Sequence, residues 1–166
     1  MNIRLALLAA MIVASALTPP LMAATSTGNV GVAVTVSARA KLELSASTVT
    51  FANADPDVVP SIPASGGAIS ITAKAKTATG AAVTLTVVAA TDLTSGGDSI
   101  AVTNVTWTAT GTGFAPGTMS KTTARTLASW TGSGSRTGTQ SYALSNSWSY
   151  PTGTFSTTAT YTLTAP

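Results

Sequence analysis

The stretch ISITAKAK, residues 69–76, decides the fold class, because apolar and polar side chains alternate along it without a break. On an extended chain, Lys74 and Lys76 fall on one face, and the apolar residues fall on the other. These apolar residues are Ile69, Ile71, Ala73 and Ala75. A period of two therefore predicts a β-strand with one buried face and one face in water.

The same alternation recurs along most of the chain, separated by turn signals such as residues 55–60 and 95–98. We expect further strands around 42–44, 49–51, 83–87, 100–107, 126–130, 140–144 and 155–163. A slip in phase near Asn104 predicts a β-bulge. About eight strands without a credible helix predict an all-β fold, an immunoglobulin-like antiparallel β-sandwich, with a closed barrel as the alternative.

The beginning of the chain, residues 1–23, has the pattern of a secretory signal peptide. Arg4 supplies a positive n-region, and the apolar run of residues 5–17 is too short to span a bilayer. The small residue Ala23 favours cleavage directly after it, and a cut after Ala16 is the alternative. We therefore expect a secreted, periplasmic or cell-surface protein.

The mature part, residues 24–166, has the length and hydrophobicity of a single β-sandwich domain. It keeps seven basic and five acidic residues once Arg4 is removed, without a Lys/Arg cluster, which argues against a nucleic-acid partner. It also has no further apolar run of spanning length, so we expect no membrane span in the mature chain.

Histidine and cysteine are both absent from the sequence. Their absence removes disulfides, thiolate nucleophiles, the usual general base and the usual zinc ligands. We therefore predict a protein that is not an enzyme and needs no cofactor. A small hydrolase that uses two facing carboxylates is the enzymatic alternative.

Two groups of residues are candidates for ligand binding. Asn53, Asp55 and Asp57 alternate in a proline-bearing loop and offer oxygen ligands for a hard cation such as calcium. Their alternative role is to cap backbone groups in a turn. Trp148 and Tyr150 are the aromatic pair that we expect to be exposed and able to stack on sugar rings, whereas core packing is the alternative for the tryptophans.

The mature chain begins with a second alternating stretch, residues 28–37. Its valines share one face: Val30, Val32, Val34 and Val36. This pattern has two interpretations. The stretch is either the first strand of its own sandwich or a donor strand that completes the sheet of another molecule.

Two segments resemble Cys-free colonisation-factor-type subunits of chaperone–usher fimbriae. They are the alternating stretch that runs into AKLEL, residues 30–44, and the final GTFS to YTLT, residues 153–164. In that family an N-terminal segment inserts into the incomplete sandwich of the next subunit. The resemblance implies that the four valines fill successive pockets there, with Gly31 on the opposite face.

The last residues, YTLTAP at 161–166, are also similar to the end of WxL-type cell-wall-binding domains, with Tyr161 where those domains carry tryptophan. Together these features predict a non-enzymatic, exported structural or adhesive cell-surface protein, a pilin-like subunit. Its expected partners are copies of itself or related subunits. The alternative function is a polysaccharide- or cell-wall-binding module.

Overall fold

The computed structural model describes residues 24–166, so the predicted signal peptide lies outside the described residues. Residues 39–166 hold all of the described strands, and we call them the body. The strands are β1 (Arg39–Leu44), β2 (Ser61–Pro63), β3 (Ile69–Lys76), β4 (Ala82–Ala89), β5 (Leu93–Ser95), β6 (Asp98–Ile100), β7 (Val105–Thr110), β8 (Gly117–Thr118), β9 (Arg125–Thr131), β10 (Gly134–Ser145) and β11 (Ala159–Thr164). A short 3-10 turn, η1 (Val102–Asn104), precedes β7.

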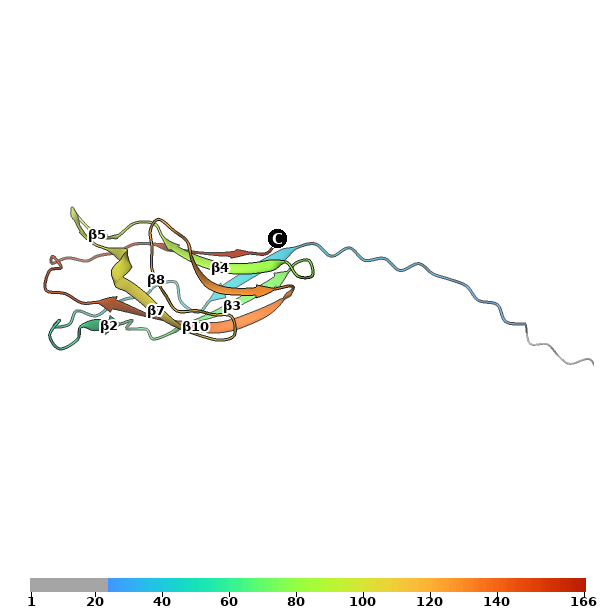
Figure 1. Cartoon of the computed structure of the whole chain (residues 1–166), viewed down its shortest axis with the longest axis horizontal. Helices are drawn as coiled ribbons and strands as arrows, with labels where there is room; N and C mark the ends of the chain where they lie inside the picture. Colours follow the sequence, from blue (N-terminus) through green and yellow to red (C-terminus); the bar gives the residue numbers. More distant parts are fainter. Residues whose placement is uncertain (1–23) are drawn as a thin grey trace, which may run out of the picture. The chain divides into compact units, whose positions relative to one another are not determined.

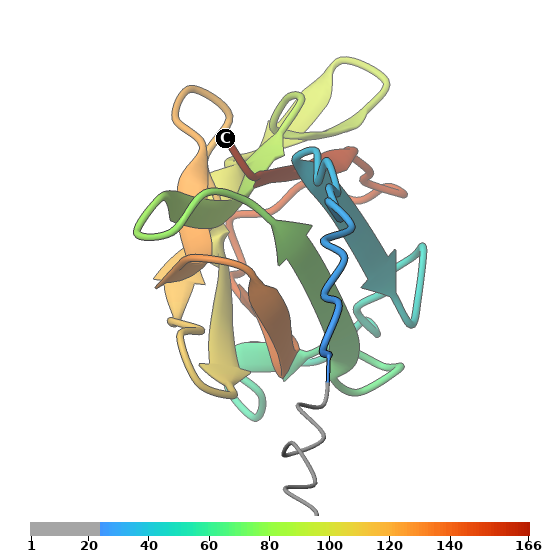
Figure 2. The same cartoon turned by 90° about the vertical axis from the view of Figure 1, so that its right-hand side faces the viewer.

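The strands form antiparallel sheets, which confirms the predicted all-β class (Figures 1 and 2). The larger sheet has the order β1-β3-β10-β7-β8, with β2 also paired to β10. The smaller sheet has the order β11-β4-β9, and β5 and β6 form a separate hairpin. Side chains from the larger and the smaller sheet share one hydrophobic core, so the body is a sandwich.

The alternating residues behave as the sequence predicts in the central strands. On β3, Ile71 and Ala73 are 0% exposed, and Lys74 on the opposite face is exposed. On β4, the side chain of Leu85 is likewise completely buried. Burial of such side chains supplies most of the free energy that holds two sheets together.

The β-bulge predicted near Asn104 is absent from that position, and the difference has a local cause. The phase slip near Asn104 is the turn η1 rather than a bulge, and it separates β6 from β7. The Asp92 carboxylate accepts the Val102 N–H, 3.0 Å away, and Asn104 N–H donates to the Ala101 carbonyl, so the turn has its own hydrogen bonds. The register shift of a bulge occurs instead between β4 and β9.

Residues 24–38 contain no strand, and β1 begins only at Arg39. The structure thus assigns no strand to residues 28–37, and both interpretations of this stretch stay predictions. Alternation makes a stretch suitable for a sheet, but a strand also needs a partner for its N–H and C=O groups. Across residues 24–166 we find no helix with the length and hydrophobicity to cross a membrane.

We expect Leu85→Ala to lower the free energy of unfolding by roughly 2–5 kcal/mol, because it leaves a cavity at the centre of the core. Urea unfolding followed by tryptophan fluorescence measures this loss. Lys74→Ala, on the exposed face of β3, is the control and should change the free energy by less than about 0.5 kcal/mol. Equal effects of the two substitutions would contradict the described core.

Candidate functional site

On one side of the body, each of the two sheets ends in an edge strand that has only one partner strand. β1 is paired only with β3, and β11 is paired only with β4. The two strands lie side by side, with Cα atoms within 8 Å, but they belong to different sheets (Figure 1). We call this boundary the β1/β11 seam. It presents unpaired N–H and C=O groups from both strands, which are a template for another strand.

The core is only half covered along this seam. Leu42 on β1 is half-buried, and Leu44 next to it is 36% exposed. On β11 the inward-facing Tyr161 and Leu163 are also only half-buried. The central strands bury equivalent side chains completely, so the seam is where an additional strand would bury the most apolar surface.

A polar network lies beneath the seam and joins the two sheets. The Tyr161 hydroxyl donates to Oε1 of Gln140, 2.6 Å away on β10. It therefore accepts the hydrogen of the Tyr142 hydroxyl, also at 2.6 Å. Gln140 is 0% exposed, and its Nε2 has no partner among the described residues. Tyr161 thus ties the edge strand β11 to the centre of the opposite sheet.

The alternating valines of the N-terminal stretch are exposed. The exposed fractions are 88% for Val30, 92% for Val32, 85% for Val34 and 67% for Val36. We call residues 29–37 the tail. Four exposed valines on one face of an extended segment form an apolar stripe that is uncovered in this structure.

The loop residues proposed as metal ligands have other roles in this structure. Asp55 Oδ1 accepts the backbone N–H of Asp57, 2.9 Å away, which closes a turn of the kind expected for aspartate in loops. Asp57 Oδ1 accepts the indole N–H of Trp148 at 3.1 Å. Asn53 lies in the same exposed loop. Within residues 24–166 no three His, Cys, Asp or Glu residues gather as a metal site would require.

The two aromatic residues of the expected sugar platform differ in exposure. Trp148 is 69% exposed, and its indole is held by Asp57. Tyr150 is half-buried, and its hydroxyl donates to the Ser145 carbonyl, so it does not extend the platform. The other two tryptophans, Trp107 and Trp130, are core residues with 2% and 8% exposure.

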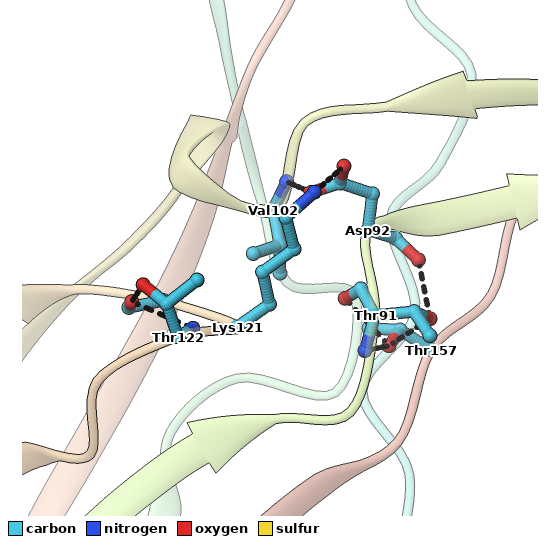
Figure 3. A network of polar contacts seen from close by, with 7 residues as sticks. Thr91, Asp92, Val102, Lys121, Thr122 and Thr157 are labelled. Carbon is cyan, nitrogen blue, oxygen red and sulfur yellow. Dashed lines mark hydrogen bonds and ion pairs between the residues drawn. The ribbon is translucent and has the colours of Figure 1, made fainter.

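A charged network fixes the loops that follow β4 and β8 (Figure 3). The Asp92 carboxylate accepts the Val102 N–H and forms an ion pair with Lys121. The Lys121 hydrogen bond, together with the Val102 N–H, lowers the pKa of Asp92. Thr157 Oγ1 donates to the Thr91 carbonyl and so attaches the segment before β11 to the same region.

Sequence reasoning missed the β1/β11 seam and the Trp148–Asp57 contact. The paired residues of that contact are 91 positions apart, and no local pattern connects them. The alternation of ATYTLT in β11 was a local signal for a strand, but the sequence does not reveal that β1 and β11 are both edge strands and lie beside each other.

The chain was compared with protein-family models, curated proteins and solved structures, and it matches none of them.

We expect the free energy of unfolding to fall above about pH 10. Burial raises the pKa of Tyr142 and of Tyr161, so the folded state keeps both phenols neutral, whereas the unfolded chain ionises them near pH 10. The stabilisation is therefore complete below that pH and is lost as the pH rises through the raised values. Urea unfolding between about pH 8 and 11 measures this loss.

The double variant Tyr142→Phe/Tyr161→Phe is the comparison for the pH series. It removes both phenols, so most of the decrease above pH 10 should disappear, and only the smaller contribution of Tyr150 should remain. An unchanged decrease in the variant would show that the two tyrosines do not cause it.

Proposed function

We propose that the protein is a structural subunit that assembles by strand addition, with the tail of one copy inserted at the β1/β11 seam of another. The observation that carries this proposal is that one molecule has both halves of the interaction. Its tail exposes an apolar stripe, and its body has a half-covered core between two unpaired strand edges. Strand addition takes affinity from main-chain hydrogen bonds and specificity from alternate side chains.

Burial of the valines and pairing of the backbone both contribute favourably to insertion. Burying a valine side chain contributes about 1.5–3 kcal/mol, so four valines contribute several kcal/mol before the cost of ordering the tail. An inserted strand also pairs with N–H and C=O groups of β1 and β11 that now face water.

Insertion requires β1 and β11 to move apart. A strand between them would set them about 10 Å apart, which is twice the spacing of neighbouring strands in a sheet. Since some Cα atoms of β1 and β11 lie within 8 Å, the two strands must separate to admit the tail.

Insertion in one direction requires a second molecule. β1 begins at Arg39, beside the point where β11 ends, because Arg39 is paired with Lys76 and Thr77 donates to the carbonyl of Pro166. A tail antiparallel to β11 would finish at the far end of the body from Arg39. Ala38 is the single residue between the tail and Arg39 and cannot cover the length of a strand. The antiparallel donor must therefore come from another copy.

We expect the mature chain, residues 24–166, to form oligomers when refolded from denaturant at high concentration, and we expect Val32→Asp/Val34→Asp to remain monomeric. The aspartates would place charges in the core of the acceptor, where they have no partner. Light scattering coupled to gel filtration measures the mass of each species.

The matched control is Ala33→Asp/Thr35→Asp. It adds the same charge to the tail, but on the face opposite the valines, so oligomers should still form. Assembly of the Val32→Asp/Val34→Asp chain to the same extent as the unmodified chain would overturn the proposal, as would a mature chain that stays monomeric throughout.

A second candidate function, a polysaccharide- or cell-wall-binding module, is favoured by Trp148 alone. Its indole is exposed and held in place by Asp57, which leaves an oriented ring face and a carboxylate for sugar hydroxyls.

We expect Trp148→Ala to abolish any retardation of the monomeric Val32→Asp/Val34→Asp chain in native gels that contain soluble cell-wall polysaccharide. Tyr150→Phe is the control and should change nothing, because its hydroxyl is already bonded to Ser145. If both chains migrate as they do in gels without polysaccharide, the binding-module function is wrong for the polysaccharides tested.

A further inference from the structure

Four of the seven cations among the described residues lie at one end of the larger sheet. Across the β1/β3 ladder, Arg39 lies opposite Lys76, and Lys41 lies opposite Lys74. Residues opposite each other in a ladder share a face, so all four lie together on the outer surface, where each is exposed. Of these four, only Lys41 has an ion-pair partner among the described residues, Glu43. We call this patch the basic end.

Most carboxylates lie at the opposite end. Asp55 and Asp57 lie in the loop that follows β1 and leads to β2, so they are beyond the far end of β1 from Arg39. Asp92 and Asp98 lie after β4 and in the β5/β6 hairpin. Figure 1 shows β2 and β5 at one end of the body and the C-terminus at the other. We call this the acidic end.

The acidic end keeps a negative charge after its internal pairing. Lys121 balances Asp92, and Arg125, opposite Val87 near the end of β4, offsets one further negative charge. Three exposed carboxylates, those of Asp55, Asp57 and Asp98, have no ion pair within the described part of the chain. The basic end stays positive even when Glu43 is counted with it. The two ends of the body, which lie at opposite ends of its strands, therefore carry net charges of opposite sign.

The two ends are far enough apart to act separately. β3 and β4 have eight residues each and span about 26 Å at about 3.3 Å per residue. This length is about three Debye lengths at physiological ionic strength. Each end therefore presents its own sign of charge to another molecule.

We propose that successive copies dock end to end, with the basic end of the donor against the acidic end of the acceptor, and that these charges set the direction in which the tail inserts. This inference rests on the proposed strand addition. Only Ala38 separates the tail from Arg39, so the donor's basic end must come within about 10 Å of the point where its tail leaves the seam. That distance is about one Debye length.

The two possible directions differ in which ends meet. β11 runs toward Pro166 at the basic end, so a tail antiparallel to β11 leaves the seam at the acidic end of the acceptor. The opposite charges then attract. A tail parallel to β11 would leave at the acceptor's basic end and would place two basic patches together, which costs free energy.

The tail itself has no charged residue between positions 29 and 37. Binding of the tail to the seam should therefore depend little on salt, and a strong salt dependence of assembly would report the contact between the ends. This difference separates the docking contact from the strand addition on which it depends.

The test uses the mature chain and follows the rate of oligomer formation by light scattering as the Debye length falls from about 30 Å to about 3 Å. We expect the rate to fall on the order of tenfold or more across this range. Lys74→Glu/Lys76→Glu should slow assembly at low salt by a similar factor, and so should Asp57→Lys/Asp98→Lys. The chain with all four substitutions exchanges the two ends and should recover the rate.

Two controls make the outcome specific. Thr108→Glu/Ser141→Glu also makes the chain more negative, but on the middle of the larger sheet, and should leave the rate nearly unchanged. A labelled peptide of residues 29–37 should bind the Val32→Asp/Val34→Asp chain equally at low and high salt, and equally after either pair of end substitutions.

The possible results distinguish the two proposals. If the peptide binds but assembly is insensitive to salt, or if the chain with all four substitutions does not recover, the end-to-end contact is wrong and strand addition stands. If the peptide does not bind at all, strand addition fails and the end-to-end contact fails with it.

Discussion

Packing of the two sheets against each other is the interaction on which the rest of the body depends. Residues such as Ile71 of β3 and Leu85 of β4 are completely buried between the sheets, whereas the inward-facing residues of β1 and β11 are not. The burial of inward-facing side chains therefore decreases from the central strands toward the β1/β11 seam. Because the central strands already hold the sandwich, the seam can open or accept a strand without loss of the rest of the core. The stability and the proposed assembly thus belong to different parts of one core.

Much of this fold could be predicted from period-two alternation. β3 and β4 follow the sequence pattern residue by residue, because both alternate between the core and the outside. β10 was predicted from 140 to 144 but begins at Gly134. Gly138 hides its first half from the pattern, because it has no side chain, and an added Cβ would overlap the Thr110 carbonyl and the Phe114 ring. Close packing thus selects a residue that carries no hydrophobic signal.

The candidate site could be predicted only in part, because its two halves, the tail and the β1/β11 seam, depend on different properties of the chain. The valine stripe of the tail is visible in the sequence, since alternation is a local property. The acceptor seam depends on which strands are at the edges of each sheet, and that is a property of topology. The two charged ends depend on register, because Arg39 and Lys76 meet only through the β1/β3 ladder. Composition shows a nearly balanced charge and conceals its division between the ends.

The first and last residues of the body, Arg39 and Pro166, lie beside two consecutive residues at the end of β3, Lys76 and Thr77. Arg39 is paired with Lys76, and the carbonyl of Pro166 accepts the hydroxyl of Thr77. A force that pulls on both chain ends would therefore peel β1 and β11 from the body one hydrogen bond at a time. A force that enters through a tail lying along a neighbour's seam would load all the bonds of that ladder at once, in shear. The mechanical strength of an assembly built from this protein would then depend on the ladders that the shared strand forms with β1 and β11 of the neighbour.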